Sequence, residues 1–264
     1  MLINYWVKHF IYIVIILFFF NSKFVLSDQK PDYKKEKNIH EQILQNIFDG
    51  NLIQFSSNIG EKFFVIEYKS PENKKSILLL HGRGLHPDEE YVMNPLRLGL
   101  YESGFNTYSM QLPVLAKGSS YIDYTKIFNF STDRIQTTIK NLSEDNKNII
   151  IIAHSCGVHM LMSWIEKFDS DSIEALILIG PEATDLGQKI IRPYPFRKIK
   201  IPILDIFGEH DYNFVKKNAR ERFNTIKMSS NPKSSQIEIY GSDHYHRDNS
   251  DELLNTVKEW LKTL

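Results

Sequence analysis

Short apolar blocks separated by helix-like segments are the feature that most constrains this chain. From residue 76 onward the blocks are mostly uninterrupted apolar runs, such as "SILLL" and "NIIIIA". A strand of this kind is covered by helices on both faces, as in a parallel sheet. Alternation of such strands with helices predicts a doubly wound α/β sheet. The expected strands are 51–55, 62–68, 76–80, 106–112, 148–153, 175–180, 201–207 and 236–240.

The first two blocks differ from the rest, because they carry more polar residues and are joined by the short connection "NIGE". This pattern favours an antiparallel hairpin at one edge of the sheet. We expect an eight-stranded, mostly parallel sheet with helices on both faces and no large cap domain, since the connection 181–200 is too short for one. The expected helices are 95–102, 131–142, 156–168, 214–227 and 251–263.

The N-terminal residues have the pattern of an export signal. Lys8 and His9 precede an uncharged block from Phe10 to Phe20, and "VLS" at 25–27 suits cleavage by signal peptidase. An uncleaved membrane anchor is the alternative, although the block is shorter than the roughly 20 residues that span a bilayer. We expect a signal peptide over 1–27, a polar linker over 28–38 and a single α/β domain over 39–264. The protein is then exported, either to a bacterial periplasm or to the medium.

Charge and cysteine content exclude several classes of function. Lys+Arg and Asp+Glu both total 32, so no broad positive field exists for nucleic acid or an anionic membrane. We expect no nucleic-acid partner, and membrane contact only through the N-terminal segment if it is retained. Cys156 is the single cysteine, which rules out an intramolecular disulfide and a cysteine-rich metal site. Histidine and carboxylate spacing typical of metal ligands is also missing, so we expect no metal or cofactor.

The stretch "IIIIAHSCGVHM", residues 149–160, places a serine between a buried strand and an apolar helix. A tight strand-to-helix turn exposes such a serine above the sheet as a nucleophile, and needs very small residues two positions before and after it. Ala153 and Gly157 hold these positions around Ser155. The pattern departs from G-x-S-x-G at its first glycine, which alanine replaces. The alternative is a serine that only caps the following helix.

A serine nucleophile needs a base, and the base needs an orienting acid. Asp211 lies three residues beyond Gly208, just past the seventh expected strand, and His244 lies three residues beyond Gly241, just past the eighth. Carboxyl ends of parallel strands share one edge of a sheet, so we expect both near Ser155. The alternatives left open are His246 as the base, Asp205 or Asp243 as the acid, and Cys156 as a reactive thiol, although we expect the Cys156 side chain to turn away from the pocket.

The order of Ser155, Asp211 and His244 on successive strand ends resembles the α/β-hydrolase superfamily of serine esterases and lipases, over roughly residues 50–264. The predicted export adds a looser resemblance to a bacterial group of secreted α/β-hydrolase-like proteins without assigned substrates. The family resemblance implies an oxyanion hole in "SILLLHGRGLHPD", made by the backbone NH groups of Arg83 and Cys156. A glycine-rich turn without a catalytic role is the alternative.

Three further expectations concern the surroundings of this site. His81 is expected to fix the oxyanion loop by hydrogen bonding. The Arg83 side chain either attracts an anionic substrate group or pairs with a carboxylate such as Asp88 or Glu89. The long connections 113–130 and 181–200 leave central strands and are candidate substrate walls.

The sequence therefore predicts an exported serine hydrolase that cleaves carboxylic ester or thioester bonds, acting on small-molecule or envelope-lipid esters. Two alternatives remain open at this point. One is a binding or scaffold protein that kept the fold without turnover, and the other is an acyltransferase that acts on a cell-envelope acceptor.

Overall fold

The computed structural model describes residues 29–145, 148–168, 170, 172–228 and 231–264. The predicted signal peptide over 1–27 lies outside these residues. Residues Pro31–Leu264 form one compact unit. Within the described part of the chain, no helix combines the length and the apolar character needed to cross a bilayer.

The centre of the unit is an eight-stranded sheet with the strand order β1-β2-β4-β3-β5-β6-β7-β8. Strands β3 to β8 run parallel to one another, whereas β1 pairs with β2, and β2 with β4, in antiparallel register. The predicted mixed sheet with an antiparallel N-terminal edge is therefore confirmed. The strands are β1 (Asn51–Ser56), β2 (Lys62–Tyr68), β3 (Lys75–Leu80), β4 (Phe105–Met110), β5 (Ile149–His154), β6 (Ala175–Ile179), β7 (Ile203–His210) and β8 (Ser235–Asp243).

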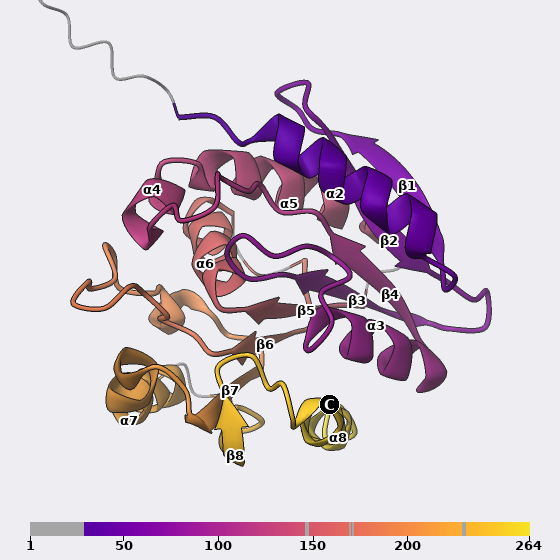
Figure 1. The fold of residues 1–264 in the computed structure, drawn as a ribbon. Helices are drawn as coiled ribbons and strands as arrows, with labels where there is room; N and C mark the ends of the chain where they lie inside the picture. Colours follow the sequence, from indigo (N-terminus) through magenta and orange to yellow (C-terminus); the bar gives the residue numbers. More distant parts are fainter. Residues whose placement is uncertain (1–28, 146–147, 169, 171, 229–230) are drawn as a thin grey trace, which may run out of the picture. The chain divides into compact units, whose positions relative to one another are not determined.

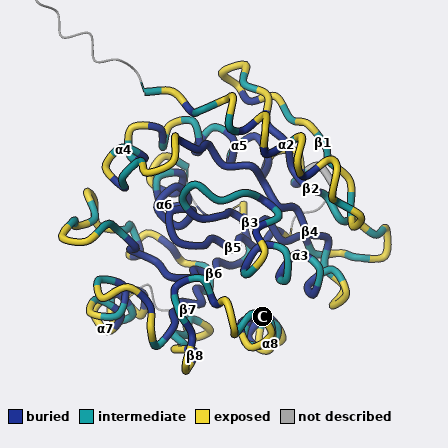
Figure 2. The backbone as a smooth tube through the Cα atoms, in the orientation of Figure 1, coloured by how far each residue is buried: buried dark blue, intermediate teal, exposed yellow. Residues whose placement is uncertain are grey.

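Helices cover both faces of this sheet, as the continuous apolar strands predict (Figure 1). Side chains alternate along a strand, so Leu78 and Ile151 join one core cluster while Ile77 and Ile150 join the other. The first cluster packs under α5 (Phe128–Asp145) and α6 (Cys156–Lys167), and the second under α3 (Met93–Glu102) and α8 (Ser250–Leu261). Helix α7 (Asn213–Lys227) lies beside β7 and contributes Ile226 to the first cluster. Figure 2 shows the central strands buried and the outer helix faces exposed.

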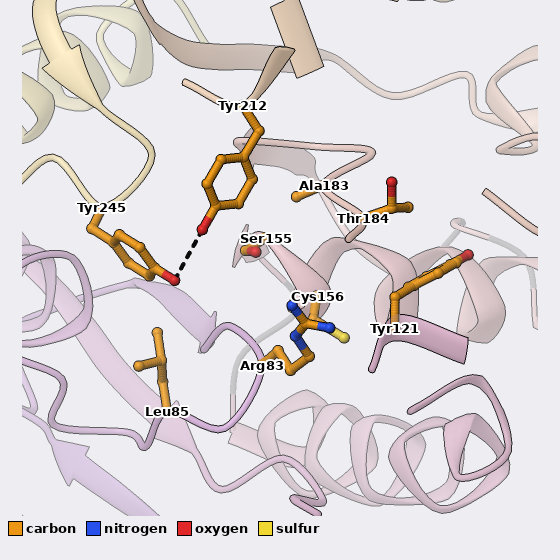
Figure 3. Close-up of a pocket in the computed structure, with 9 residues that line it drawn as sticks. All are labelled: Arg83, Leu85, Tyr121, Ser155, Cys156, Ala183, Thr184, Tyr212 and Tyr245. Carbon is orange, nitrogen blue, oxygen red and sulfur yellow. Dashed lines mark hydrogen bonds between the residues drawn. The ribbon is translucent and has the colours of Figure 1, made fainter. Parts of the chain in front are cut away.

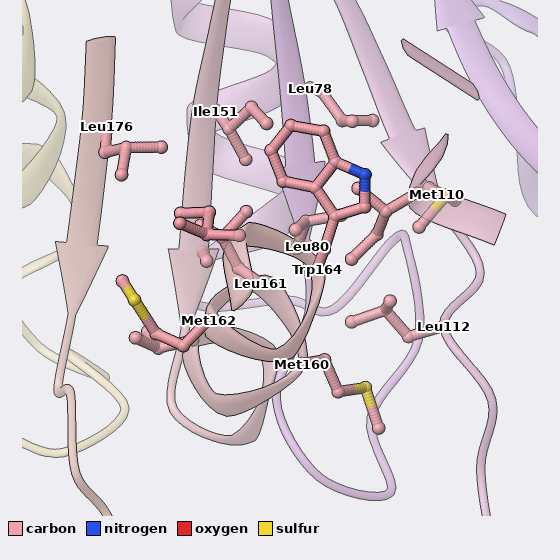
Figure 4. Close-up of a cluster of buried hydrophobic side chains, with 14 of the residues drawn as sticks. Leu78, Leu80, Met110, Leu112, Ile151, Met160, Leu161, Met162, Trp164 and Leu176 are labelled. Atoms are coloured by element: carbon pink, nitrogen blue, oxygen red, sulfur yellow. The ribbon is translucent and has the colours of Figure 1, made fainter. Parts of the chain in front are cut away.

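Helix α6 packs tightly against the central strands of the sheet. Figure 4 shows Leu161 and Trp164 of α6 beside Leu78, Leu80 and Ile151 of the strands. All five side chains are buried, and the Trp164 indole NH donates a hydrogen bond to Gln136 on α5. The start of α6, where the predicted nucleophile lies, is thus fixed by the largest core cluster.

The predicted polar linker over 28–38 is wrong from Tyr33 onward, because helix α2 spans Tyr33–Asn46. The Asp32 carboxylate caps this helix by accepting the Lys35 NH. Its polar first turns give no apolar period, but Glu36 is buried there in an ion pair with Arg134. The ion pair stabilises a segment that composition alone would leave irregular. Two short elements were also missed: α4 (Tyr121–Thr125) and the 3₁₀ helix η1 (Phe196–Lys198).

Candidate active site

Ser155 forms the sharp turn between β5 and α6 that the sequence predicts. Its φ of 53° lies in the left-handed region that non-glycine residues rarely adopt, and its NH donates a 2.8 Å hydrogen bond to the Ile179 carbonyl. A side chain at Gly157 would approach the Leu80 carbonyl oxygen to 2.6 Å, which explains the need for glycine there. The Ser155 side chain makes no capping hydrogen bond to α6, so the helix-cap alternative is wrong.

The ends of β7 and β8 bring Asp211 and His244 to this serine. His244 Nε2 lies 2.8 Å from Ser155 Oγ, and His244 Nδ1 lies 2.6 Å from Asp211 Oδ1. The carboxylate can only accept, so Nδ1 carries a proton and donates to Asp211, and Nε2 is the ring nitrogen that faces the serine hydroxyl. Both side chains are buried. The hydroxyl, imidazole and carboxylate form one continuous chain of hydrogen bonds.

The backbone around His244 is fixed by two other histidines. His154 Nε2 donates to the His244 carbonyl over 3.0 Å, and His246 Nδ1 lies 2.7 Å from the Ser242 hydroxyl. Burial lowers the pKa of His154 well below its ordinary value and that of His246 to about 4, so both rings stay neutral. His246, the alternative base, therefore bonds within its own loop, and the structure does not bring it to Ser155.

The two alternative acids also have other partners. Asp205 is fully buried on β7 and pairs with Arg222 over 2.8 Å. Asp243 accepts the Tyr245 NH and pairs with Arg247, which shapes the turn that follows β8. Strands β7 and β8 also run past the predicted glycine turns, with an irregularity in register at Gly208/His210.

The predicted oxyanion loop follows β3 and is held by His81. Nε2 of this ring accepts the Leu112 NH over 3.0 Å, so Nδ1 carries the proton and donates to the Gly82 carbonyl over 2.8 Å. Burial lowers the pKa of His81 to about 3, which keeps the ring neutral. Within the described part of the chain, the backbone NH groups of Arg83 and Cys156 donate no hydrogen bond, so both are available to an oxyanion.

The model of DUF3530, a family of proteins of unknown function, matches residues 123–263. The chain belongs to this family. The matched segment contains Ser155, Asp211 and His244, whereas the predicted oxyanion loop precedes it. No curated protein sequence matches the chain.

Solved structures show which fold this DUF3530 protein adopts. It is similar to the Pyrococcus furiosus esterase Pf2001, with a TM-score of 0.63, 16% identity, and 82% of this chain and 91% of that chain covered. For Est1E from Butyrivibrio proteoclasticus the TM-score is 0.60 at 16% identity, over 81% of this chain and 98% of that one. XC6422 from Xanthomonas campestris is described as an α/β serine hydrolase without lid. Its TM-score is 0.58 at 10% identity, and the match covers 82% of this chain and 95% of that one. The DUF3530 chain therefore has the α/β-hydrolase fold.

A pocket lies directly beside Ser155 in this DUF3530 protein (Figure 3). The two connections expected as substrate walls both contribute to it, through Tyr121 and through Ala183 and Thr184. Cys156 also lines the pocket, so the expectation that its side chain turns away from it is wrong. Burial nevertheless raises the pKa of the Cys156 thiol to about 12, which makes it a poor nucleophile. The lining residues are Arg83, Leu85, Tyr121, Ser155, Cys156, Ala183, Thr184, Tyr212 and Tyr245.

The Arg83 side chain forms a bidentate ion pair with Asp185, at 2.9 and 2.6 Å. Both partners are about one-third exposed, at 31% each. The carboxylate partners suggested by the sequence are wrong, because Asp88 pairs with Arg97 and Glu89 caps the start of α3. The Arg83–Asp185 pair joins the loop that follows β3 to the connection between β6 and β7.

Sequence reasoning missed two tyrosines at the mouth of the pocket. Tyr212 stacks on the His244 ring with centroids 4.2 Å apart, and its hydroxyl lies 3.2 Å from that of Tyr245. Figure 3 shows this hydroxyl pair beside Ser155. Each tyrosine directly follows a predicted triad residue in the chain, Asp211 or His244, which is the signal that could have found them. In the described residues, no cluster of three or more metal-ligating side chains is found.

Proposed function

We propose that this protein is an exported serine hydrolase that cleaves carboxylic ester or thioester bonds. The observation that carries the proposal is the unbroken hydrogen-bond chain from Ser155 Oγ through His244 to the buried Asp211. Export is supported by the N-terminal sequence alone.

The geometry supports the following first half-reaction. His244 Nε2 accepts the proton as Ser155 Oγ attacks the carbonyl carbon of the ester. Asp211 holds the ring in the required tautomer and stabilises the imidazolium that forms. The carbonyl oxygen gains negative charge and receives hydrogen bonds from the NH groups of Arg83 and Cys156.

The second half-reaction restores the enzyme. The His244 imidazolium gives its proton to the departing alcohol or thiol, which leaves an acyl group on Ser155. Water enters the pocket, loses a proton to His244 and attacks the acyl carbon. The tetrahedral intermediate collapses, the acid is released, and Ser155 regains its proton from His244.

A fluorophosphonate probe tests this proposal on the purified chain. We expect covalent labelling of the wild type and none of Ser155→Ala, together with a loss of ester turnover of about 10⁴-fold or more. Ser103→Ala, at the end of α3 and away from the pocket, is the matched control and should label normally. Labelling that persists in Ser155→Ala, or a wild type that does not label, would reject the proposed nucleophile. Export is tested separately by sequencing the N-terminus of protein recovered outside the cytoplasm.

A further inference from the structure

The connection between β6 and β7 has a strongly one-sided charge. From Leu186 to Lys200 it contains five Lys or Arg residues and no Asp or Glu, in a chain whose total charge is zero. All five basic side chains are exposed: Lys189, Arg192, Arg197, Lys198 and Lys200. The neutral composition of the whole chain conceals this local positive segment.

The same segment exposes two large aliphatic side chains. Leu186 is 101% exposed and Ile191 is 51% exposed. Leu186 is held in a defined turn, because the Gln188 NH donates to the Asp185 carbonyl over 2.9 Å and the Thr184 hydroxyl donates to the Gln188 carbonyl over the same distance. The turn therefore presents Leu186 to solvent at a fixed position.

This turn lies at the mouth of the candidate active site. The Ile191 NH donates to the hydroxyl of Tyr121, and Asp185 pairs with Arg83, so two pocket residues hold the segment. Figure 1 shows the connection, in orange, projecting outward between α4 and α7. Ile122 on α4, next to Tyr121, is also 39% exposed.

We propose that residues 186–200 dock this protein onto an anionic lipid surface. Exposed aliphatic side chains bury their surface at the headgroup boundary, while Lys and Arg are attracted by anionic headgroups. A soluble polyanion would use the basic residues but would leave Leu186 and Ile191 in water. Arg192 has one acidic neighbour, Glu166 at 3.4 Å, but this exposed pair is weak and exchanges readily with a lipid phosphate. Docking does not require the proposed hydrolase activity.

The single buried cysteine permits a direct test. Cys156 is 3% exposed and burial raises the pKa of its thiol to about 12, so a maleimide fluorophore at Leu186→Cys will label that position selectively. The label is followed on vesicles of phosphatidylcholine with about one-third phosphatidylglycerol, and on vesicles of phosphatidylcholine alone. We use the full chain and a chain that begins at Asp28, because Pro31–Leu264 form one compact unit.

We expect a blue shift of the label at 186 on anionic vesicles and little change on neutral ones. Tyr240→Cys is the matched control, because Tyr240 is 84% exposed on β8 and outside the segment, and its label should not shift. The proposal is overturned if the label at 186 does not shift, if both labels shift equally, or if neutral vesicles give an equal shift.

Replacing basic residues of the segment tests the electrostatic contribution to the proposed lipid docking. The triple variant Lys189→Gln, Arg192→Gln and Lys198→Gln should weaken binding to anionic vesicles by about tenfold or more. Its control replaces three exposed lysines elsewhere, Lys34, Lys62 and Lys140, and should bind as the wild type does. Equal loss in both triple variants would show a nonspecific charge effect and overturn the assignment to this segment.

Discussion

Gly180 leaves room for the His244 ring, because it has no side chain. It follows β6 with a φ of +55°, and a Cβ built there would lie 2.7 Å from His244 Cε1 and 2.9 Å from Nδ1. Gly180→Ala must therefore displace the imidazole from Asp211 or Ser155. Because misplacement by about 1 Å costs on the order of 10²-fold in rate, we expect kcat to fall by about that factor while the protein stays folded. Steady-state ester hydrolysis with circular dichroism measures both.

Gly60→Ala separates backbone strain from displacement of the ring. Gly60 also has a positive φ, +82°, but no atom lies within 4 Å of the position that a Cβ would take, and the residue is located in the β1–β2 connection. Its replacement should cost about 1 kcal/mol of stability and leave kcat unchanged. If Gly180→Ala behaves in the same way, the steric role given to Gly180 is wrong.

The sequence predicts the positions of Ser155, Asp211 and His244 because each follows a strand, and parallel strands bring such residues to one edge. It does not predict the partner of Arg83, since Asp185 is distant in the chain and only the folded connection brings it near. Nor does it predict the contact between Gly180 and the His244 ring, which depends on the path of the backbone after β6.

A buried ion cluster joins several elements behind the site. Arg222 on α7 pairs with Asp205 on β7 over 2.8 Å and with Glu182, in the β6–β7 connection, over 3.1 Å. Gln236 on β8 also donates to Asp205 over 2.6 Å. Arg222 is therefore the central cation for an acid on β7 and an acid in the segment that lines the pocket.

Arg222→Met should destabilise the fold by about 3–5 kcal/mol, because it leaves two buried carboxylates without their cation. Unfolding in urea measures this loss. Arg220→Met changes an exposed arginine of the same helix and should stay within about 0.5 kcal/mol of the wild type. In a background that carries Asp205→Asn and Glu182→Gln, Arg222→Met should cost much less. An equal cost in both backgrounds would show that lost packing, and not charge, is responsible.

The strands of the sheet and the long helices that cover it could be predicted, because their apolar patterns indicate them. Helix α2 could not be predicted in this way. Its first turns are polar, and their order comes from the Glu36–Arg134 pair with a helix far along the chain. The short α4 depends on a capping box between Ser120 and Asp123, a local signal that is weak within a long connection.

At the scale of the whole molecule, buried neutral histidines make stability depend on pH. Burial lowers the pKa of His81 to about 3 and those of His159 and His246 to about 4, and holds that of His154 well below its ordinary value. In the unfolded chain these rings titrate near pH ~6.5. At a pH between the lowered pKa of the folded state and that of the unfolded chain, the unfolded state binds more protons than the folded state. Acid therefore favours unfolding.

The contribution of these histidines to the free energy of unfolding should therefore be complete above pH ~6.5. It should fall as the pH approaches ~4, by about 1.4 kcal/mol per pH unit for each histidine. Glu36 and Glu182 act in the opposite direction, since burial raises their pKa, so on acidification the folded state takes up protons at these two groups before the unfolded state does. The four buried histidines act together with His86, whose pKa burial also lowers, and these five groups outnumber the two acids. We therefore expect the midpoint of thermal unfolding to decrease steadily from pH 7 to 4.5. His246→Asn removes one of the four and should make the decrease shallower. A midpoint that does not change over this range would show that these rings titrate alike in both states.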